Sequence, residues 1–272
     1  MDAESLKTAA LITIGGRAYP PYGQVLLLAG GAGSGKGFQL QNVIGLKGKV
    51  LDVDAFKKLA LTNASVQRLI KRKTGIDVAE LNLDMKNTAD VSTLHKIVRD
   101  AQLEELWWKC VEMSKPLKTK PNLIFDKTLK SFESIVNIRD SVLNVGYEME
   151  NIHIVWVLNK IEIAIKQNAE RDRRVDENIL RNTHEGVSRT MYQLIKLGDQ
   201  MSNYVGGDVW ISFNQANVDV ISQKTKAGEF IIDDKTAICV KKQGKQADLS
   251  VFNKHLIAKI LEYTQDIGWE RF

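Results

Sequence analysis

A glycine-rich turn near residue 30 limits what this chain can fold into more than any other feature of its sequence. Residues 24–38 read QVLLLAGGAGSGKGF, so an apolar run leads directly into a segment with four glycines in six residues and then into Gly35-Lys36. The run at 25–28 is expected to form a buried strand, and glycines, which lack a Cβ atom, let backbone N–H groups converge on an anion. The spacing G-x-x-x-x-G-K and the order strand, loop, helix predict a phosphate-binding loop.

The residues of this loop indicate how a nucleotide would be held. Lys36 would supply a positive charge for the β- and γ-phosphates of ATP. The loop resembles that of adenylate kinases and related nucleoside monophosphate kinases, which also have glycine after the lysine. Because neither Gly37 nor Phe38 carries a hydroxyl group, Mg²⁺ would need carboxylate or water ligands from elsewhere. The residues predicted to bind ATP are Gly31, Ala32, Gly33, Ser34, Gly35, Lys36, Gly37 and Phe38.

The composition is typical of a soluble α/β protein. The chain has 272 residues, of which 44% are hydrophobic and 26% charged, enough for one large domain or one domain with an insertion. Its apolar runs are much shorter than the roughly 20 residues that span a bilayer, and its N-terminus is polar, so we expect a cytoplasmic protein without membrane contact. The spacing of Cys110 and Cys239 indicates neither a disulfide framework nor a zinc site. The net charge of +5 favours a polyanionic partner such as a nucleotide or a nucleic acid.

Apolar segments and the helical patterns between them predict the fold class. Besides 25–28, strands are expected at 50–56, 121–128, 151–160 and 207–215. Amphipathic patterns such as 132–146 and 184–201 separate these runs, which predicts a doubly wound, parallel, five-stranded α/β sheet of the P-loop kinase type.

Two intervals depart from simple strand-helix alternation. Residues 57–120 are too many for a single crossover and contain several amphipathic patterns, which predicts a helical insertion over the carboxyl ends of the strands. Residues 229–265 predict a hairpin that turns at 233–235, followed by a terminal amphipathic helix. With an arginine-bearing lid at 169–181, these parts are expected to form one kinase domain over residues 1–272.

Carboxylates at the ends of two predicted strands suit phosphoryl transfer. This reaction needs an in-line pose, neutralised phosphate charge and a carboxylate that orients or deprotonates the acceptor hydroxyl. Asp52 and Asp54 are two residues apart in the strand predicted at 50–56, so both should point to one face of the sheet beside the phosphate loop. Asp126 ends the apolar run of the next strand, in the position of a Walker B aspartate that holds Mg²⁺. Asp52 and Asp126 are therefore the predicted metal ligands.

The segment VLDVDAFKKLA, residues 50–60, resembles the acceptor side of zeta-toxin kinases, where a D-x-D-x-F-K pattern follows the second strand. In that family an aspartate at this place serves as the base for the substrate hydroxyl. The resemblance implies that Asp54 is the catalytic base here.

The arginine-rich segment AERDRRVDENILR, residues 169–181, resembles the lid exit of adenylate kinases, where arginines close over the transferred phosphoryl group. The resemblance implies catalytic roles for Arg171, Arg173 and Arg174, with Arg181 as a further candidate. Such arginines would spread the charge of the transition state and exclude water. Alternating arginines and acids are also typical of an exposed helix with i, i+4 ion pairs, so a surface helix without a catalytic role stays an alternative.

Together these features predict an ATP-dependent kinase that phosphorylates a hydroxyl of a nucleotide, a nucleotide-sugar or a nucleic acid. Zeta-toxin-like kinases use a sugar nucleotide, polynucleotide kinases use a 5′-hydroxyl, and similar viral kinases use a hydroxymethylated base in DNA. Basic residues at 57–73 favour a nucleotide or a nucleic acid. The alternative is an inactive nucleotide-binding or structural protein that keeps the loop, as the missing hydroxyl at position 37 would allow.

Overall fold

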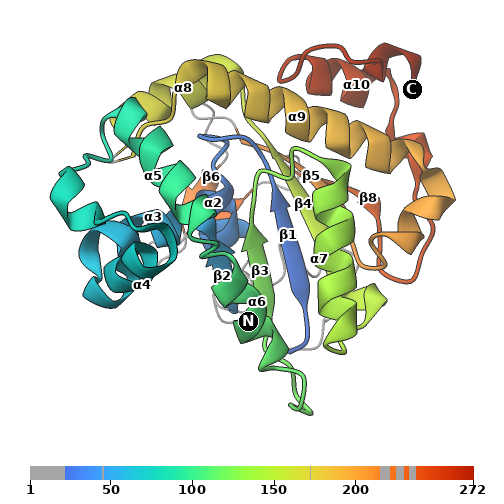
Figure 1. Ribbon diagram of the computed structural model, residues 1–272. Coiled ribbons are helices and arrows are strands. Elements are labelled where there is room, and N and C mark those ends of the chain that lie inside the picture. The colour runs from blue at the N-terminus through green and yellow to red at the C-terminus, as the bar shows by residue number, and fades with distance from the viewer. Residues whose placement is uncertain (1–21, 45, 172, 215–220, 225–229, 233–236) are drawn as a thin grey trace.

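A mixed six-stranded sheet forms the centre of the fold (Figure 1). The computed structural model describes residues 22–44, 46–171, 173–214, 221–224, 230–232 and 237–272. The strands follow the order β2-β3-β1-β4-β5-β8, in which the first five are parallel and β8 runs antiparallel to β5. Their bounds are β1 Val25–Ala29, β2 Lys49–Asp52, β3 Leu123–Asp126, β4 Ile152–Leu158, β5 Val209–Phe213 and β8 Ala237–Lys241.

The five predicted strands are all present and parallel, but the predicted number of strands in the sheet is wrong. Strand β5 is buried along its whole length, so its outer edge needs a partner for its backbone groups, and β8 provides one. The hairpin predicted within 229–243 also does not form as expected. Strand β7 (Phe230–Ile232) pairs with β6 (Ile221–Lys224) in a separate two-stranded sheet, whereas β8 joins the main sheet. The turn predicted at 233–235 lies outside the described residues.

Helices cover both faces of the sheet. In Figure 1, α7 and α9 lie in front of the strands, and α3 to α5 extend to the side at the carboxyl ends of β2 and β3. The interval 57–120 is largely helical. The α-helices are α2 Lys36–Gln39, α3 Val53–Thr62, α4 Ala64–Thr74, α5 Thr88–Asp100, α6 Glu105–Glu112, α7 Phe132–Asn144, α8 Ile161–Glu170, α9 Glu177–Lys196 and α10 Lys254–Leu261, and a π-helical turn, Leu40–Ile44, continues α2.

Alternate residues of the central strands enter two separate cores, which explains their near-continuous apolar sequences. In β1, Leu27 faces the larger core with α7 and α9, while Leu26 and Leu28 face a smaller core covered by the turn after α2. A strand that is buried on both faces needs apolar residues at every position. None of the helices in the described part of the chain combines the length and the apolar character needed to span a bilayer.

A buried polar network fastens β8 to the amino ends of the parallel strands. His153 accepts a hydrogen bond at Nδ1 from the Asp208 backbone N–H (2.9 Å), so its proton lies on Nε2, which donates to Gln24 Oε1 (2.9 Å). Lys241, only 2% exposed, donates to the carbonyl oxygens of Gly206 (2.7 Å) and Gly207 (2.9 Å). The network therefore requires a neutral His153.

We expect stability to fall as the pH drops through the range in which His153 titrates. Burial lowers the pKa of His153 from 6.5 to about 4; the charge of Asp208 opposes this shift and that of Lys241 adds to it. The unfolded chain therefore binds this proton more readily, and stability present above pH 6.5 is lost towards pH 4, by up to about 3 kcal/mol. Urea unfolding against pH measures the loss. His153→Gln should remove this part of the pH dependence; parallel curves for the two proteins would contradict the account.

Candidate active site

The carbonyl oxygens of the loop between β1 and α2 accept hydrogen bonds from side chains and from the following helix. Lys36 Nζ donates to Gly30 O (2.9 Å) and to Gly31 O (3.3 Å). The next four carbonyls are bonded in turn by His184 Nε2 to Ala32 O (2.8 Å), Asn159 Nδ2 to Gly33 O (3.0 Å), Asn214 Nδ2 to Ser34 O (2.9 Å) and Gln39 N to Gly35 O (3.0 Å). In a trans peptide unit the N–H points away from the C=O, so these bonds leave the N–H groups of Gly33, Gly35 and Lys36 on the opposite side of the loop, whereas that of Ser34 donates to Gly31 O (3.2 Å). Such a row of donors suits an anion.

Two glycines of the loop are required by its backbone. Gly33 and Gly35 have φ of 73° and 88°, values that favour glycine. A Cβ at Gly33 would lie 2.7 Å from the carbonyl oxygen of Ala164, and one at Gly35 would lie 2.0 Å from Asn214 Nδ2. At Gly37 a Cβ would meet nothing within 4 Å. The conformation therefore depends on glycine at 33 and 35 but not at 37.

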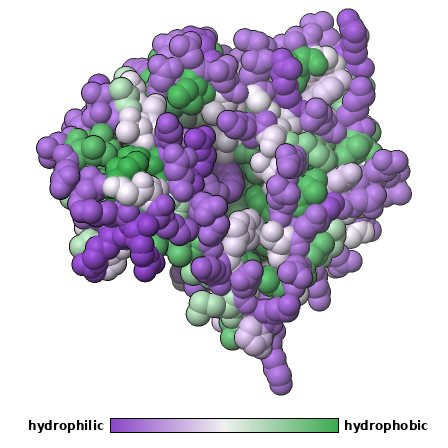
Figure 2. All heavy atoms as spheres, viewed as in Figure 1, coloured by the Kyte–Doolittle hydropathy of each residue, from purple (hydrophilic) through white to green (hydrophobic). Residues whose placement is uncertain are grey.

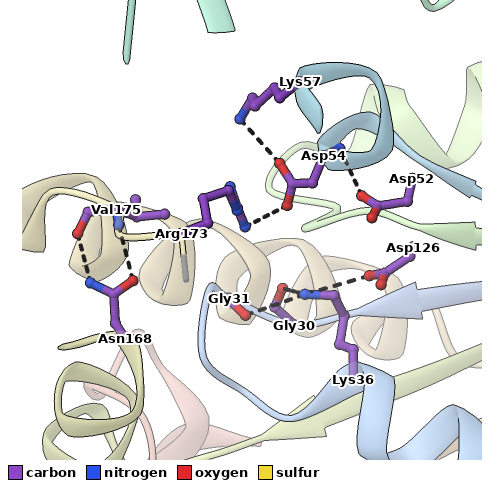
Figure 3. A network of polar contacts seen from close by, with 10 residues as sticks. All are labelled: Gly30, Gly31, Lys36, Asp52, Asp54, Lys57, Asp126, Asn168, Arg173 and Val175. Carbon is purple, nitrogen blue, oxygen red and sulfur yellow. Dashed lines mark hydrogen bonds and ion pairs between the residues drawn. The ribbon is translucent and has the colours of Figure 1, made fainter. Parts of the chain in front are cut away.

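The predicted metal ligands lie side by side at the carboxyl edge of the sheet. Asp52 and Asp126 are register partners at the ends of β2 and β3, and Asp126 is also the partner of Leu28, one residue before the end of β1. Lys36 Nζ lies 3.7 Å from Asp126 Oδ1 (Figure 3). Burial lowers the pKa of Lys36, whereas the charges of Asp126 and Asp54 raise it. The loop lysine and both carboxylates thus meet in one place.

Asp54 does not share a strand face with Asp52, contrary to the prediction. Strand β2 ends at Asp52, and α3 begins at Val53, so Asp54 lies in the first turn of a helix. The Asp52 carboxylate caps this helix by accepting a hydrogen bond from the Asp54 N–H (2.8 Å). The predicted strand at 50–56 was therefore too long, because an aspartate N-cap starts a helix inside it. Asp54 instead projects from the helix above the sheet edge.

The surroundings of Asp52 fit a magnesium ion. Burial, followed by the charge of Asp54, raises the pKa of Asp52 to about 6, so a bound cation would stabilise its ionised form. Among the described residues no group of three or more His, Cys, Asp or Glu could hold a metal. Asp52 and Asp126 offer two carboxylates, and Mg²⁺ in nucleotide sites commonly takes one or two, completed by water and phosphate oxygens.

Asp54 is held by two cations from different parts of the chain. Its Oδ1 lies 3.1 Å from Lys57 Nζ, and its Oδ2 forms an ion pair with Arg173 (Figure 3). The Lys57 side chain is 8% exposed and that of Arg173 is 16% exposed, so both charges are largely removed from water. The segment predicted as a lid therefore reaches the carboxylate predicted as the base.

Only one of the candidate arginines contacts an aspartate of the site. Arg171 and Arg174 are exposed, although the charge of Arg171 contributes to the lowered pKa of Lys36. Arg181 forms an exposed i, i+4 ion pair with Glu177 (2.7 Å), as expected for the surface-helix alternative. The structure therefore distinguishes Arg173 from its neighbours, which the sequence alone could not.

The backbone around Arg173 is fixed at two points. Asn168 donates from Nδ2 to the Val175 carbonyl (2.7 Å) and accepts at Oδ1 from the Val175 N–H (3.0 Å). The Arg174 N–H donates to the Met85 carbonyl between η2 (Val78–Leu81) and α5 (3.1 Å). Asn168 is 8% exposed, so these bonds are sheltered. The arginine segment thus bridges α8 and the helical part of the chain over 57–120.

Several of these residues escaped the sequence analysis. Asn159 and Asn214 directly follow β4 and β5, just as Asp52 and Asp126 end their strands, so the polar residue after each apolar run was an available signal. His184 had no such signal, because only the fold brings α9 onto the loop. Burial lowers its pKa, so the neutral ring donates to Ala32 O.

Figure 2 shows a hollow in the surface near the carboxyl ends of β1 and β3, bordered by hydrophilic residues. A different cavity, of about 220 Å³, lies between β4, α8, α9 and the C-terminal segment, and His184 lines it. Its lining includes no residue from 57–120, from the phosphate loop or from the three aspartates. That cavity therefore does not form the meeting place of Lys36, Asp54 and Arg173.

Comparison with known proteins finds a similar fold among solved structures. No protein-family model matches the chain, and no curated protein matches its sequence. A chain in the crystal structure of AvrRxo1-ORF1:-ORF2 with ATP superposes with a TM-score of 0.50 at 15% identity, covering 97% of this chain and 77% of that one. The chain therefore shares its fold with that structure. A chain of the PezAT toxin-antitoxin system of Streptococcus pneumoniae gives a TM-score of 0.41 at 15% identity, over 86% of this chain and 83% of that one.

Proposed function

We propose that this chain is an ATP-dependent phosphotransferase that moves the γ-phosphate to a hydroxyl of a nucleotide, a nucleotide-sugar or a nucleic acid. The observation that carries the proposal is the meeting of Lys36, Asp126, Asp54 and Arg173 beside the glycine-rich loop (Figure 3). The fold shared with a structure solved with ATP supports ATP as the donor.

Each part of the reaction has a residue to perform it. The backbone N–H groups of Gly33, Gly35 and Lys36, together with the Lys36 ammonium group, would bind the β- and γ-phosphates. Asp54 would orient the acceptor hydroxyl and take its proton, while the acceptor oxygen bonds to the γ-phosphorus and the bond to the bridging oxygen breaks, releasing ADP. Arg173 would neutralise charge on the transferred group. Asp52 and Asp126 would hold Mg²⁺, which supplies further charge neutralisation when bound.

The loop conformation predicts a contrast between two neighbouring glycines. Gly35→Ala should weaken binding of an ATP analogue by about tenfold or more, because its positive φ disfavours Cβ and the new methyl would displace Asn214 from Ser34 O. Gly37→Ala keeps the backbone N–H through which Gly37 would bind ATP and has open space around its Cβ, so it is the matched comparison and should change the affinity by less than about twofold. Equilibrium titration measures both, and equal losses would contradict the structure of the loop.

The basic residues of α4 indicate which kind of acceptor the protein would bind. Four cations are exposed there, but Lys71 pairs with Asp77 (2.7 Å) and Lys73 with Glu105 (3.4 Å), which reduces the excess charge. The remaining ones are Arg68 and Arg72. Phosphate contacts make affinity for nucleic acid fall with salt. If a nucleic acid is the acceptor, the double variant Arg68→Gln, Arg72→Gln should weaken binding of a 5′-hydroxyl oligonucleotide and flatten its salt dependence.

A transfer assay with several acceptors tests the proposal. The protein would be incubated with Mg²⁺, γ-labelled ATP and separate panels of nucleotides, nucleotide-sugars and 5′-hydroxyl oligonucleotides, and products would be separated by chromatography. We expect label on a hydroxyl within one panel. ATP binding without transfer or hydrolysis in every panel would instead favour an inactive nucleotide-binding protein.

A further inference from the structure

The carboxylate assigned as the base is already occupied. Lys57 engages Oδ1 of Asp54 and Arg173 engages Oδ2, so each oxygen faces a cation (Figure 3). An acceptor hydroxyl that takes Oδ2 has to displace the Arg173 guanidinium. The contact that brings the lid arginine into the site therefore also blocks the acceptor.

The two cations differ in how easily they can move away from the Asp54 carboxylate. Lys57 lies three residues after Asp54 on α3, and its side chain is 8% exposed, so the helix itself holds it in place. Arg173 comes from the connection between α8 and α9, whose backbone is held by Asn168 at Val175 and by the bond from Arg174 N–H to Met85 O, while the Arg173 side chain itself is held by neither. A rotation of the arginine side chain breaks its ion pair without disturbing α3. Arg173 is thus the cation that can be exchanged.

A bound nucleotide would offer Arg173 a stronger partner nearby. Lys36, which would bind the β- and γ-phosphates, is close enough to the arginine segment for Arg171 to influence its pKa, and Asp54 also acts on it. A triphosphate carries several negative charges where Asp54 carries one, so the Coulomb attraction on Arg173 is larger once the nucleotide is in place.

We propose that Arg173 is a latch with two alternative partners, Asp54 in the free protein and the nucleotide phosphates in the complex. Nucleotide binding then uncovers Asp54, so the acceptor binds second and the base is blocked until a phosphoryl donor is present. This inference rests on the proposed function, since it assumes that the loop binds a nucleotide and that Asp54 serves as the base.

The latch has a thermodynamic consequence that needs no known acceptor. If the nucleotide must break the pair between Arg173 and Asp54, part of its binding free energy is used for that step, and removing the Asp54 carboxylate should raise its affinity. Removal of a negative charge near the phosphates would raise the affinity as well. The two causes separate in a double-mutant cycle, because only the latch requires Arg173.

The test is calorimetric titration with a non-hydrolysable ATP analogue and Mg²⁺ on the full chain. Four proteins would be compared: wild type, Asp54→Asn, Arg173→Gln and the double variant. We expect Asp54→Asn to tighten binding about five- to tenfold in the wild-type background and less than about twofold in the Arg173→Gln background. Asp77→Asn, which removes a carboxylate paired with Lys71 on the surface, is a matched control and should leave the affinity unchanged.

Other outcomes separate the latch from the function on which it rests. An equal gain in both backgrounds would mean simple charge removal, and no gain would mean that Arg173 does not exchange partners; either result overturns the latch. No binding to the wild-type protein, or equal binding to a Lys36→Met variant, would overturn the proposed nucleotide site instead. Thermal melting checks that each variant is folded, and Asp54→Ser replaces Asp54→Asn if the latter is not.

Discussion

Replacement of Lys36 with methionine should abolish phosphoryl transfer, lowering kcat/KM by about three orders of magnitude or more. The Lys36 side chain is 14% exposed, and its ammonium group lies between the carbonyls of Gly30 and Gly31 and the Asp126 carboxylate. Methionine keeps most of the length and apolar stem of lysine but removes the charge that would face the phosphates. Initial rates of label transfer from γ-labelled ATP measure the effect.

The control for this loss is another lysine near the site. Lys58 follows Lys57 on α3 and is exposed, so Lys58→Met should retain at least about half of the wild-type rate. Retention of more than a tenth of the wild-type rate in Lys36→Met would mean that the loop lysine does not serve the reaction.

Asp54→Asn should separate binding from chemistry. We expect kcat to fall by about 10² to 10⁴, since an amide cannot take the proton of the acceptor hydroxyl. The affinity for the ATP analogue should not fall, because the substitution leaves the loop and Lys36 in place and frees Arg173 from its ion pair. Transfer rates at saturating ATP, measured beside the equilibrium titration, test both halves of this expectation.

A matched substitution shows whether the carboxylate itself is needed. Asp54→Glu keeps the charge and should recover part of the lost rate, whereas a purely structural role would make the longer side chain no better than asparagine. A kcat for Asp54→Asn within about threefold of the wild-type value would contradict the assignment of the base.

The centre of the sheet could be predicted because β1, β3, β4 and β5 are buried on both faces. Sequences such as VLLLA and IHIVWVL leave few other structures open, and all five parallel strands overlap the predicted runs. Strand β8 was not predicted as a partner of β5, because this antiparallel pairing joins strands that are not neighbours in the sequence. The nearby turn residues favoured a local hairpin instead. The change from strand to helix after Asp52 was not predicted, because an aspartate suits both the end of a strand and the N-cap of a helix.

The candidate site was predictable where a residue type follows directly from its place on a strand. The glycines and the lysine directly follow a strand, and the two aspartates end strands. The structure brings Lys36, Asp52 and Asp126 together. The choice among three arginines has no local signal, since it depends on contacts between α3 and a segment more than a hundred residues later. The same holds for His184, which reaches the loop only through the packing of α9.

The most direct test of the central claim is a single-turnover experiment with γ-labelled ATP, Mg²⁺ and the three acceptor panels, run with wild-type protein and with Asp54→Asn. The account predicts label on an acceptor hydroxyl with the wild type and almost none with the variant, although both proteins bind the nucleotide. Equal transfer by the two proteins, or ATP bound by the wild type with no transfer to any acceptor, would contradict it.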